Sequence, residues 1–361
     1  MTARQEPRAA AVVASATAAR STTATVARAV QYPNPGRAST FTDTSALAPP
    51  PCSSHRALSW CVCAKTNTAS STHKAPSLHC TMKRRQPAAE PTNLDPLPVR
   101  LSVATLNVWT TKDRPGGPWP ARIPALQKLL RLCNADIIGV QEAHPDILAV
   151  VDEALPTHAR IAPEDEAADS ICWRAEGTIY YRRAALELLG HGCECAGSFL
   201  EKPNRRLFWA RFRVCGAGSV LFSTCHMPWQ GTASEVQSGV SARFACSHAV
   251  ADALKALSQP GEPAFCVGDF NESFGPPRVL RTAANFVDCF TALCLPATPT
   301  HPARPSSAKE EELPDRTLDW ICANEHATPI LANVLRPSPG LLSTAAVHAS
   351  DHFPVVAVYE I

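Results

Sequence analysis

Long apolar runs are missing from this 361-residue chain. No stretch of about 18 or more apolar residues occurs, and this excludes a membrane-spanning helix. A secretory signal peptide is also disfavoured, because the apolar stretch 9–19 is only weakly hydrophobic and Arg20 and Arg28 interrupt the residues after it. Nothing in the sequence therefore predicts insertion into a membrane.

Large side chains are scarce in the first 95 residues. Alanine, serine and threonine fill 43 of these 95 positions, and the aromatic residues among them are Tyr32, Phe41 and Trp60. The other 20 of the 23 aromatic residues lie in the remaining 266. A segment so poor in large apolar groups buries too little surface to offset its ordering entropy. We therefore predict a disordered segment over residues 1–95 and one globular domain over residues 96–361.

Acidic residues are scarce in the same segment. Residues 1–95 carry 11 Lys or Arg against 4 Asp or Glu, whereas residues 96–361 carry 23 against 28. The overall charge of +2 is thus a tail of +7 joined to a domain of −5. A domain of negative net charge argues against binding nucleic acid through a broad basic surface.

The tail has three interpretations that the sequence leaves open. An Arg-rich, Ser/Thr-rich and acid-poor N-terminus is typical of an organelle transit peptide. The alternatives are an untargeted disordered tail and an untranslated extension of the gene model, with Met82 as the true start. The protein is accordingly expected in mitochondria or plastids if it is targeted, and in the cytoplasm or nucleus if it is not.

The fifteen cysteines do not follow the spacing of a zinc site. Cys225, Cys266 and Cys322 stand singly inside apolar runs, where cysteine behaves as a small hydrophobic residue. The pair Cys193 and Cys195 has one intervening residue instead of the two to four usual at zinc sites. We expect mostly free thiols in a reducing intracellular compartment, and no structural zinc.

Short β-type runs alternate with helical patterns from residue 96 onward. Apolar spacing predicts helices over 120–133 and 234–257, the second with Val236, Val240, Phe244, Leu254 and Leu257 on its apolar face. The stretch 296–314 is rich in proline, serine and charge, and is expected to be a loop. Many strands with few long helices indicate a single α/β or α+β domain. Strands are expected over 101–108, 136–140, 178–181, 208–214, 220–225, 264–267, 318–322 and 355–361.

Polar residues stand at the ends of these apolar strands. Each alone has an ordinary explanation, such as a turn, a helix cap or a hydrogen-bonded core residue. Six such strand ends carrying carboxylates, amides and two histidines are hard to explain as caps, and they would form a polar pocket if the ends share one edge. The residues concerned are Asn107, Glu142, His226, Asp269, Asn271, Asp319, Asp351 and His352.

Five segments resemble, in the same order, the signatures of the endonuclease/exonuclease/phosphatase (DNase I-like) superfamily, and the resemblance covers about residues 100–361. It implies an α/β fold, a four-layer α/β/β/α sandwich with its active site at one end of two packed sheets. It also implies metal-dependent hydrolysis of phosphate esters. The matching segments are Thr105 to Trp109, Asp136 to Glu142, Gly268 to Asn271, Thr317 to Ile321 and Ser350 to Val355.

The resemblance implies a metal site of oxygen ligands. Asn107 and Glu142 match the ligands of Mg²⁺, with Mn²⁺ as a substitute, and hard cations of this kind prefer oxygen donors. Asp351 matches a residue that helps to bind the metal or positions the attacking water. Burying carboxylates that lack a positive partner costs free energy, and this cost independently supports a bound cation.

The resemblance also implies roles in catalysis. Asp269 would orient and deprotonate the nucleophilic water, with Asn271 holding the phosphate or that carboxylate. His352 would donate a hydrogen bond to a phosphoryl oxygen, with Asp319 fixing its tautomer and keeping it protonated. His226 would be a second donor to the phosphate.

Two further positions bear on the site. Alternation along the strand allows only one of Tyr180 and Tyr181 to face the pocket, and we choose Tyr181, because the family often has a tyrosine reaching the site there. Trp109 stands where abasic-site endonucleases of the family usually have an acidic residue, which removes a group that supports the metal.

The sequence favours a Mg²⁺-dependent phosphodiesterase acting on nucleic acid or nucleotides, and we expect a monomer. Trp109, Trp119, Trp173 and Trp229 could stack bases at the rim, although each is also suited to the core. Nuclease activity requires a local basic cluster, for which the candidates are Arg182, Arg183, Lys202, Arg205 and Arg206. The alternatives are a phosphomonoesterase or a sphingomyelinase-like lipid phosphodiesterase with the same residues, and a catalytically inactive binding module on this fold.

Overall fold

The computed structural model describes residues 98–111, 118–161, 176–195, 198–199, 204–303, 314–336 and 348–361. All of them belong to one compact unit, Arg85–Ile361. The prediction of a disordered segment over residues 1–95 falls outside the described residues. In the described part, no helix is long and apolar enough to cross a membrane.

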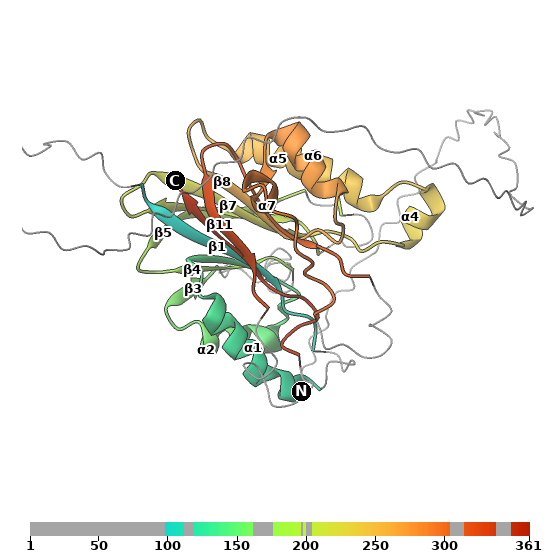
Figure 1. Ribbon diagram of the computed structural model, residues 1–361, viewed down its shortest axis with the longest axis horizontal. Helices are drawn as coiled ribbons and strands as arrows, with labels where there is room; N and C mark the ends of the chain where they lie inside the picture. The colour runs from blue at the N-terminus through green and yellow to red at the C-terminus, as the bar shows by residue number, and fades with distance from the viewer. Residues whose placement is uncertain are drawn as a thin grey trace, which may run out of the picture. The chain divides into compact units, whose positions relative to one another are not determined.

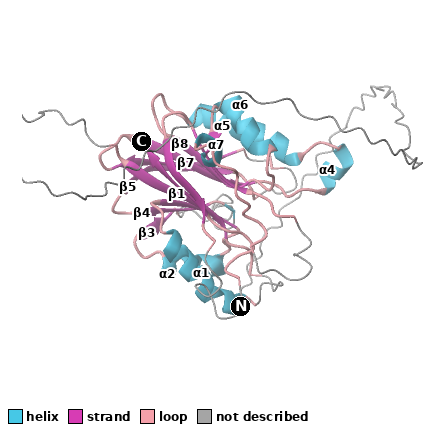
Figure 2. Cartoon of the chain, viewed as in Figure 1, coloured by secondary structure: helices cyan, strands magenta, loops and turns pink. Residues whose placement is uncertain are grey.

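Two mixed six-stranded sheets form the centre of the domain (Figure 2). The eight expected strands are all present, with their ends shifted by at most two residues. The first sheet has the order β11 (Thr328–Val334), β12 (Val355–Glu360), β1 (Arg100–Asn107), β2 (Ile137–Gln141), β4 (Thr178–Arg182) and β3 (His158–Arg160). The second has the order β5 (Leu186–Glu194), β6 (Leu207–Val214), β7 (Ser219–His226), β8 (Ala264–Asp269), β10 (Asp319–Ala323) and β9 (Val287–Asp288).

Helices cover the outer face of each sheet (Figure 1). On the first sheet, α1 (Trp119–Cys133) and α2 (Pro145–Ala154) bury their apolar faces against β1 and β2. On the second, α5 (Ala242–Leu257) and α6 (Gly275–Ala284) lie side by side. The short helices α4 (Ala233–Ser238) and α7 (Cys289–Ala292) complete the described helices. The predicted four-layer α/β/β/α sandwich is therefore confirmed.

The helix expected over 234–257 is two helices, and the first half of its expected apolar face was wrong, whereas Leu254 is buried as expected. Gly239 ends α4 in the left-handed conformation, with φ of 69°, and the hydroxyl of Ser241 caps the start of α5. This break resets the helical phase, so that Ala242, Cys246 and Val250 face the core. Val236, Val240 and Phe244, which the single-helix pattern placed inside, are exposed.

The expected core cysteines are buried as free thiols. Cys225, Cys266 and Cys322 lie on the adjacent strands β7, β8 and β10 and are inaccessible to solvent. Burial raises the pKa of the Cys322 thiol well above its usual range. The three thiols therefore pack as small apolar side chains in the core that contains the second sheet.

Gly268 brings β7 and β8 together immediately before the strands end. Its φ is +145°, and a Cβ atom there would lie 1.9 Å from the carbonyl oxygen of Cys225. Only glycine tolerates both conditions. The close approach sets His226 directly beside Asp269 in the parallel pair β7–β8.

Asp136 ties together three strands of the first sheet. Its Oδ2 accepts hydrogen bonds from the backbone N and the Oγ of Ser102, and its Oδ1 accepts one from Arg182 Nε at 2.8 Å. Burial alone would raise the pKa of this carboxyl, but the bonds from Ser102 and Arg182 outweigh burial and leave the pKa lowered.

We predict that Asp136→Asn removes stability at neutral pH and not in acid. Because the folded state lowers this pKa, the carboxylate stabilises the fold above its unfolded pKa of about 3.9, and the contribution is lost as the pH falls through the folded value. Urea midpoints of the wild type and the variant should therefore converge toward pH 3. The matched control is Glu325→Gln at an exposed position. If the difference in urea midpoint between the wild type and Asp136→Asn stayed constant from pH 7 to pH 3, this prediction would be contradicted.

Candidate active site

The predicted polar strand ends meet at one edge of the sandwich. Asn107 and His226 end β1 and β7, and each of these strands runs parallel to a neighbour, β2 and β8 respectively, that ends at the same edge. Strands β10 and β12 run antiparallel to β8 and β1, so the residues at their starts arrive at this edge too. A pocket of about 500 Å³ lies there, lined among others by Asn107, Glu142, His226, Asp269, Asn271, Asp351 and His352.

Asp269 stands at the centre of these residues and is 1% exposed. Its Oδ2 accepts a hydrogen bond from Asn107 Nδ2 at 3.0 Å. The same oxygen lies 3.4 Å from His226 Nε2 and 3.7 Å from His352 Nε2. The other oxygen, Oδ1, accepts the backbone N–H of Asn271 at 2.8 Å. One buried carboxylate thus contacts an amide and two imidazoles.

Asn271 lines the pocket, and its amide nitrogen is already engaged. Its Nδ2 donates to the carbonyl oxygen of Met227 at 2.9 Å, and its backbone φ is 53°. Of the two roles expected from the sequence, this geometry fits the one of holding the Asp269 carboxylate in place.

His352 and Asp319 form a buried pair. Nδ1 of His352 lies 2.7 Å from Oδ2 of Asp319, which is fully buried. The backbone N–H of Asp319 is in turn bound to Thr300 Oγ1. Burial lowers the pKa of His352, but Asp319 and Asp269 outweigh burial and raise the pKa well above its usual range. This environment favours the protonated form of His352, which lines the pocket.

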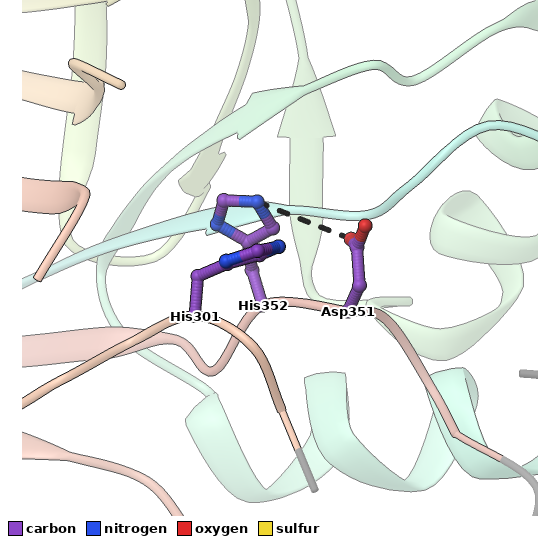
Figure 3. A group of neighbouring side chains, drawn as sticks. All are labelled: His301, Asp351 and His352. Carbon is purple, nitrogen blue, oxygen red and sulfur yellow. Dashed lines mark ion pairs between the residues drawn. The ribbon is translucent and has the colours of Figure 1, made fainter. Parts of the chain in front are cut away.

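Asp351 precedes His352 and points toward it (Figure 3). Its Oδ1 lies 4.0 Å from His352 Nε2. Burial, reinforced by the nearby carboxylates Glu142 and Asp269, raises the pKa of Asp351 to about 7. The protein thus gathers more negative charge here than its own cations neutralise.

Asn107 and Glu142 are held together at the ends of β1 and β2. Glu142 adopts a φ of 59° and its Oε1 accepts from Asn107 Nδ2 at 3.2 Å, while its Oε2 accepts from the backbone N of Thr110 at 3.1 Å. Ser350 Oγ donates to the carbonyl oxygen of Asn107 and so ties the loop before β12 to β1. The Asn107 amide thus turns its Nδ2 toward the carboxylates, while its Oδ1 accepts the backbone N–H of Trp109 at 2.9 Å.

Glu176 belongs to the site, and the sequence analysis missed it. Its Oε2 lies 2.9 Å from His226 Nδ1, and its Oε1 lies 3.4 Å from Arg205 Nε. Burial raises the pKa of Glu176, but His226 and Arg205 outweigh burial and bring the pKa to about 2. His226 thus has a carboxylate behind it, as His352 has Asp319. An acidic residue two positions before the predicted strand 178–181 was the available signal.

Tyr181 does not lie at the site, contrary to the prediction. Strand β4 runs antiparallel to β2, and Tyr181 pairs with Ile137 at the opposite end of β2 from Glu142. Its ring packs on Phe212 with centroids 4.9 Å apart. Tyr180 faces the other way and donates to Asp152. The physical reason is strand direction, because an antiparallel strand brings its first residues to this edge and leaves its last ones at the other.

His301 is a second residue that the sequence analysis missed. It lies in the described part of the expected loop 296–314, and its ring is tilted against that of His352 with centroids 4.8 Å apart (Figure 3). Burial, together with the neighbouring His352, lowers the pKa of His301 to about 3. A neutral imidazole therefore lines the pocket beside a charged one.

Arg122 is fully buried and holds the segment that follows β1 at the site. Its guanidinium donates to the carbonyl oxygens of Val108, Trp109 and Thr110, which follow Asn107 in the chain. It also donates to the carbonyl of Ala349 and lies 4.4 Å from the centroid of the Trp109 ring. Trp109 is thus a buried partner of this arginine and no base-stacking surface.

The sequence matches the model of the Endonuclease/Exonuclease/phosphatase family over residues 104–352. The chain belongs to this family. The match covers every residue of the site described above. Members of the family are hydrolases of phosphoric esters, and the family fold is the sandwich found here. A comparison with curated proteins gives no match.

Several solved structures share the fold of this family member. An endonuclease/exonuclease/phosphatase family protein from Bacteroides thetaiotaomicron is 22% identical, with a TM-score of 0.56, covering 73% of this chain and 98% of its own. A mannosyl-6-phosphatase from the same organism is 21% identical, with a TM-score of 0.54, covering 71% and 98%. D. rerio TDP2 in complex with a single-strand DNA product is 14% identical, with a TM-score of 0.57, covering 73% and 99%.

We predict that Arg122→Met destabilises the domain by about 2–4 kcal/mol, because it leaves several buried carbonyl oxygens without donors. Urea unfolding followed by circular dichroism measures the change. Arg131→Met, on the exposed side of the same helix, is the matched control and should stay within about 0.5 kcal/mol of the wild type. Equal unfolding midpoints for the two variants would show that Arg122 does not support this edge.

Proposed function

We propose that this family member is a divalent-metal-dependent phosphodiesterase. The observation that carries the proposal is the convergence of two histidine–carboxylate pairs, His352–Asp319 and His226–Glu176, on the buried carboxylate Asp269. Such a set would offer hydrogen-bond donors for an anion next to a base for water, and hydrolysis of a phosphate ester needs both.

The donor chemistry fits a hard divalent cation. Glu142 and Asp351 would supply carboxylate oxygens, which Mg²⁺ or Mn²⁺ prefers, and Asn107 would add its amide oxygen on turning away from the backbone N–H of Trp109. The raised pKa of Asp351 also fits, because uncompensated carboxylates gather there. When bound, the cation would neutralise charge on the phosphate and lower the pKa of water.

The remaining steps fall to side chains of this chain. Asp269, fixed by Asn107 and Asn271, would accept a proton from the attacking water. His352, kept charged by Asp319, would donate a hydrogen bond to a phosphoryl oxygen, on which charge builds up. His226 would donate a second hydrogen bond, with Glu176 holding its other nitrogen.

Among the residues that the structure describes, the basic side chains expected to hold nucleic acid do not gather at the pocket. Arg182 pairs with Asp136 at the far end of β2, and Arg183 donates to the carbonyl of Pro156. Arg205 does line the pocket, but it pairs with Glu176. Lys202 lies outside the described residues. A nucleotide or the end of a nucleic acid therefore remains the first substrate to test, whereas a long duplex is disfavoured.

A second candidate is a lipid phosphodiester, and one observation favours it. Trp229 lines the pocket while 59% exposed, and other exposed apolar residues follow it along the chain. An exposed indole at the mouth of the pocket suits either a base or an apolar chain on the substrate.

We predict Mg²⁺-dependent hydrolysis of bis-p-nitrophenyl phosphate that exceeds hydrolysis of p-nitrophenyl phosphate and is abolished by EDTA. Glu142→Gln should lower kcat/KM for the diester by about 100-fold or more, since it removes a carboxylate from the metal site. The matched control is Glu187→Gln, at an exposed ion pair with Arg213, which should retain wild-type activity.

Three outcomes would contradict the assignment in different ways. Failure to hydrolyse either ester in the presence of metal would favour the inactive binding module. Full activity of Glu142→Gln would show that the active site does not lie at this edge of the sandwich. Faster hydrolysis of the monoester would replace the phosphodiesterase with a phosphomonoesterase.

A further inference from the structure

The backbone around His301 is tied to the turn that carries Asp351. The backbone N–H of His301 donates to the carbonyl oxygen of Arg316 at 3.0 Å, and the N–H of Arg316 donates back to the carbonyl oxygen of His301 at 2.8 Å. Two residues further on, the N–H of Ala303 donates to the carbonyl oxygen of Asp351 at 2.7 Å. Backbone hydrogen bonds on both sides therefore fix where the imidazole of His301 enters the pocket.

The imidazole of His301 points toward the carboxylate of Asp351 (Figure 3). One ring nitrogen of His301, one ring nitrogen of His352 and one carboxylate oxygen of Asp351 all lie within 4.8 Å of one another. Among the residues that the structure describes, no group forms a hydrogen bond with either ring nitrogen of His301. A nitrogen without a partner thus faces a carboxylate inside the pocket.

The two neighbouring histidines differ in what lies behind their rings. Nδ1 of His352 lies 2.7 Å from Oδ2 of Asp319, and the proposed function uses the other nitrogen of His352 as a donor to the phosphate. In the described part of the chain, no carboxylate pairs with His301 from behind. An imidazole without such a carboxylate can bind a metal ion through the lone pair of its neutral form. His301 is therefore the nitrogen donor that remains available beside Asp351.

A nitrogen ligand changes which ions a site prefers. Mg²⁺ is bound by oxygen atoms and keeps several of its waters, whereas first-row transition ions also accept imidazole nitrogen. The carboxylates of Glu142 and Asp351 suit both kinds of ion, so they do not discriminate between them. The donor atoms of His301 and Asp351 are close enough for small side-chain movements to bring both onto one ion.

We propose that His301 is a nitrogen ligand of the divalent ion that Asp351 binds, and that it makes the site select a first-row transition ion such as Mn²⁺ over Mg²⁺. Mg²⁺ still binds through the carboxylates, with lower affinity. Ligation of the ion by His301 does not depend on the reaction, whereas the use of that ion in hydrolysis rests on the proposed phosphodiesterase function.

The first test is electron spin echo spectroscopy of the full chain with Mn²⁺ below equimolar amounts, because this method detects nitrogen atoms that ligate the ion. We expect a nitrogen signal in the wild type that His301→Phe abolishes, although a phenyl ring can still pack on His352. The matched control is His326→Phe, at a histidine that is 40% exposed and does not line this pocket. This control should keep the signal.

Calorimetric titration with Mn²⁺ and with Mg²⁺ gives the second readout. His301→Phe should weaken Mn²⁺ binding about tenfold or more and leave Mg²⁺ binding close to that of the wild type, because Mg²⁺ makes little use of nitrogen ligands. His301→Gln, which offers an amide oxygen instead, should lose the nitrogen signal and keep its Mg²⁺ affinity. Agreement between the two variants guards against a fold defect in either one.

Three results would overturn the ligand role of His301. The first is a wild type that shows no nitrogen signal. The second is a signal and a Mn²⁺ affinity that persist in both His301 variants. The third is an unchanged Mn²⁺ affinity with weaker binding of inorganic phosphate, which would make His301 a donor to the phosphate instead. Loss of the signal with an unchanged ratio of Mn²⁺ to Mg²⁺ affinity would overturn the selectivity.

Hydrolysis of bis-p-nitrophenyl phosphate separates this proposal from the proposed function. A protein that shows the nitrogen signal of His301 but hydrolyses neither the diester nor the monoester would sustain the ligand role and overturn the phosphodiesterase. Hydrolysis of the diester by a wild type without that signal would do the reverse.

Discussion

The hydrogen bond from Asn107 Nδ2 to Asp269 Oδ2 joins the two sheets at their functional edge. Asn107 ends β1 in the first sheet and Asp269 ends β8 in the second, and both are almost fully buried. In that setting an amide–carboxylate bond is strong, and losing either partner would leave a buried polar group unsatisfied. The bond also fixes the position of the carboxylate around which His226 and His352 are arranged.

Charge balance is the second constraint on this edge. Glu142, Asp269, Asp319, Asp351 and Glu176 bring five carboxylates to the site, and the neighbouring cationic side chains are His352, Arg122 and Arg205. Such a cluster costs free energy unless more positive charge joins it. The same excess that makes the site costly gives it affinity for a divalent cation and, through that cation, for a phosphate ester.

The strands and most of the site could be predicted because both follow from the pattern of apolar runs with polar ends. Four strands were not predicted: β3 and β9 are only three and two residues long, and in β5 and β11 Gly190, Gly192 and Pro329 obscure the alternation. Tyr181 was wrongly placed at the site and Glu176 was missed, because the sequence does not say which way β4 runs. Arg122 and His301 reach the site through tertiary contacts alone, from a helix and a loop. The helix breaks at Gly239 between α4 and α5. Because of this break, three residues expected in the core are exposed.

The most direct test of this account is a crystal structure of the protein soaked with Mn²⁺ and inorganic phosphate, because anomalous scattering locates the metal. The account predicts one manganese bound by Glu142 and Asp351 near Asn107, with phosphate oxygens within hydrogen-bond distance of His226 and His352. Manganese bound elsewhere, or phosphate away from both histidines, would contradict the central claim that these strand ends form a single cation and phosphate site.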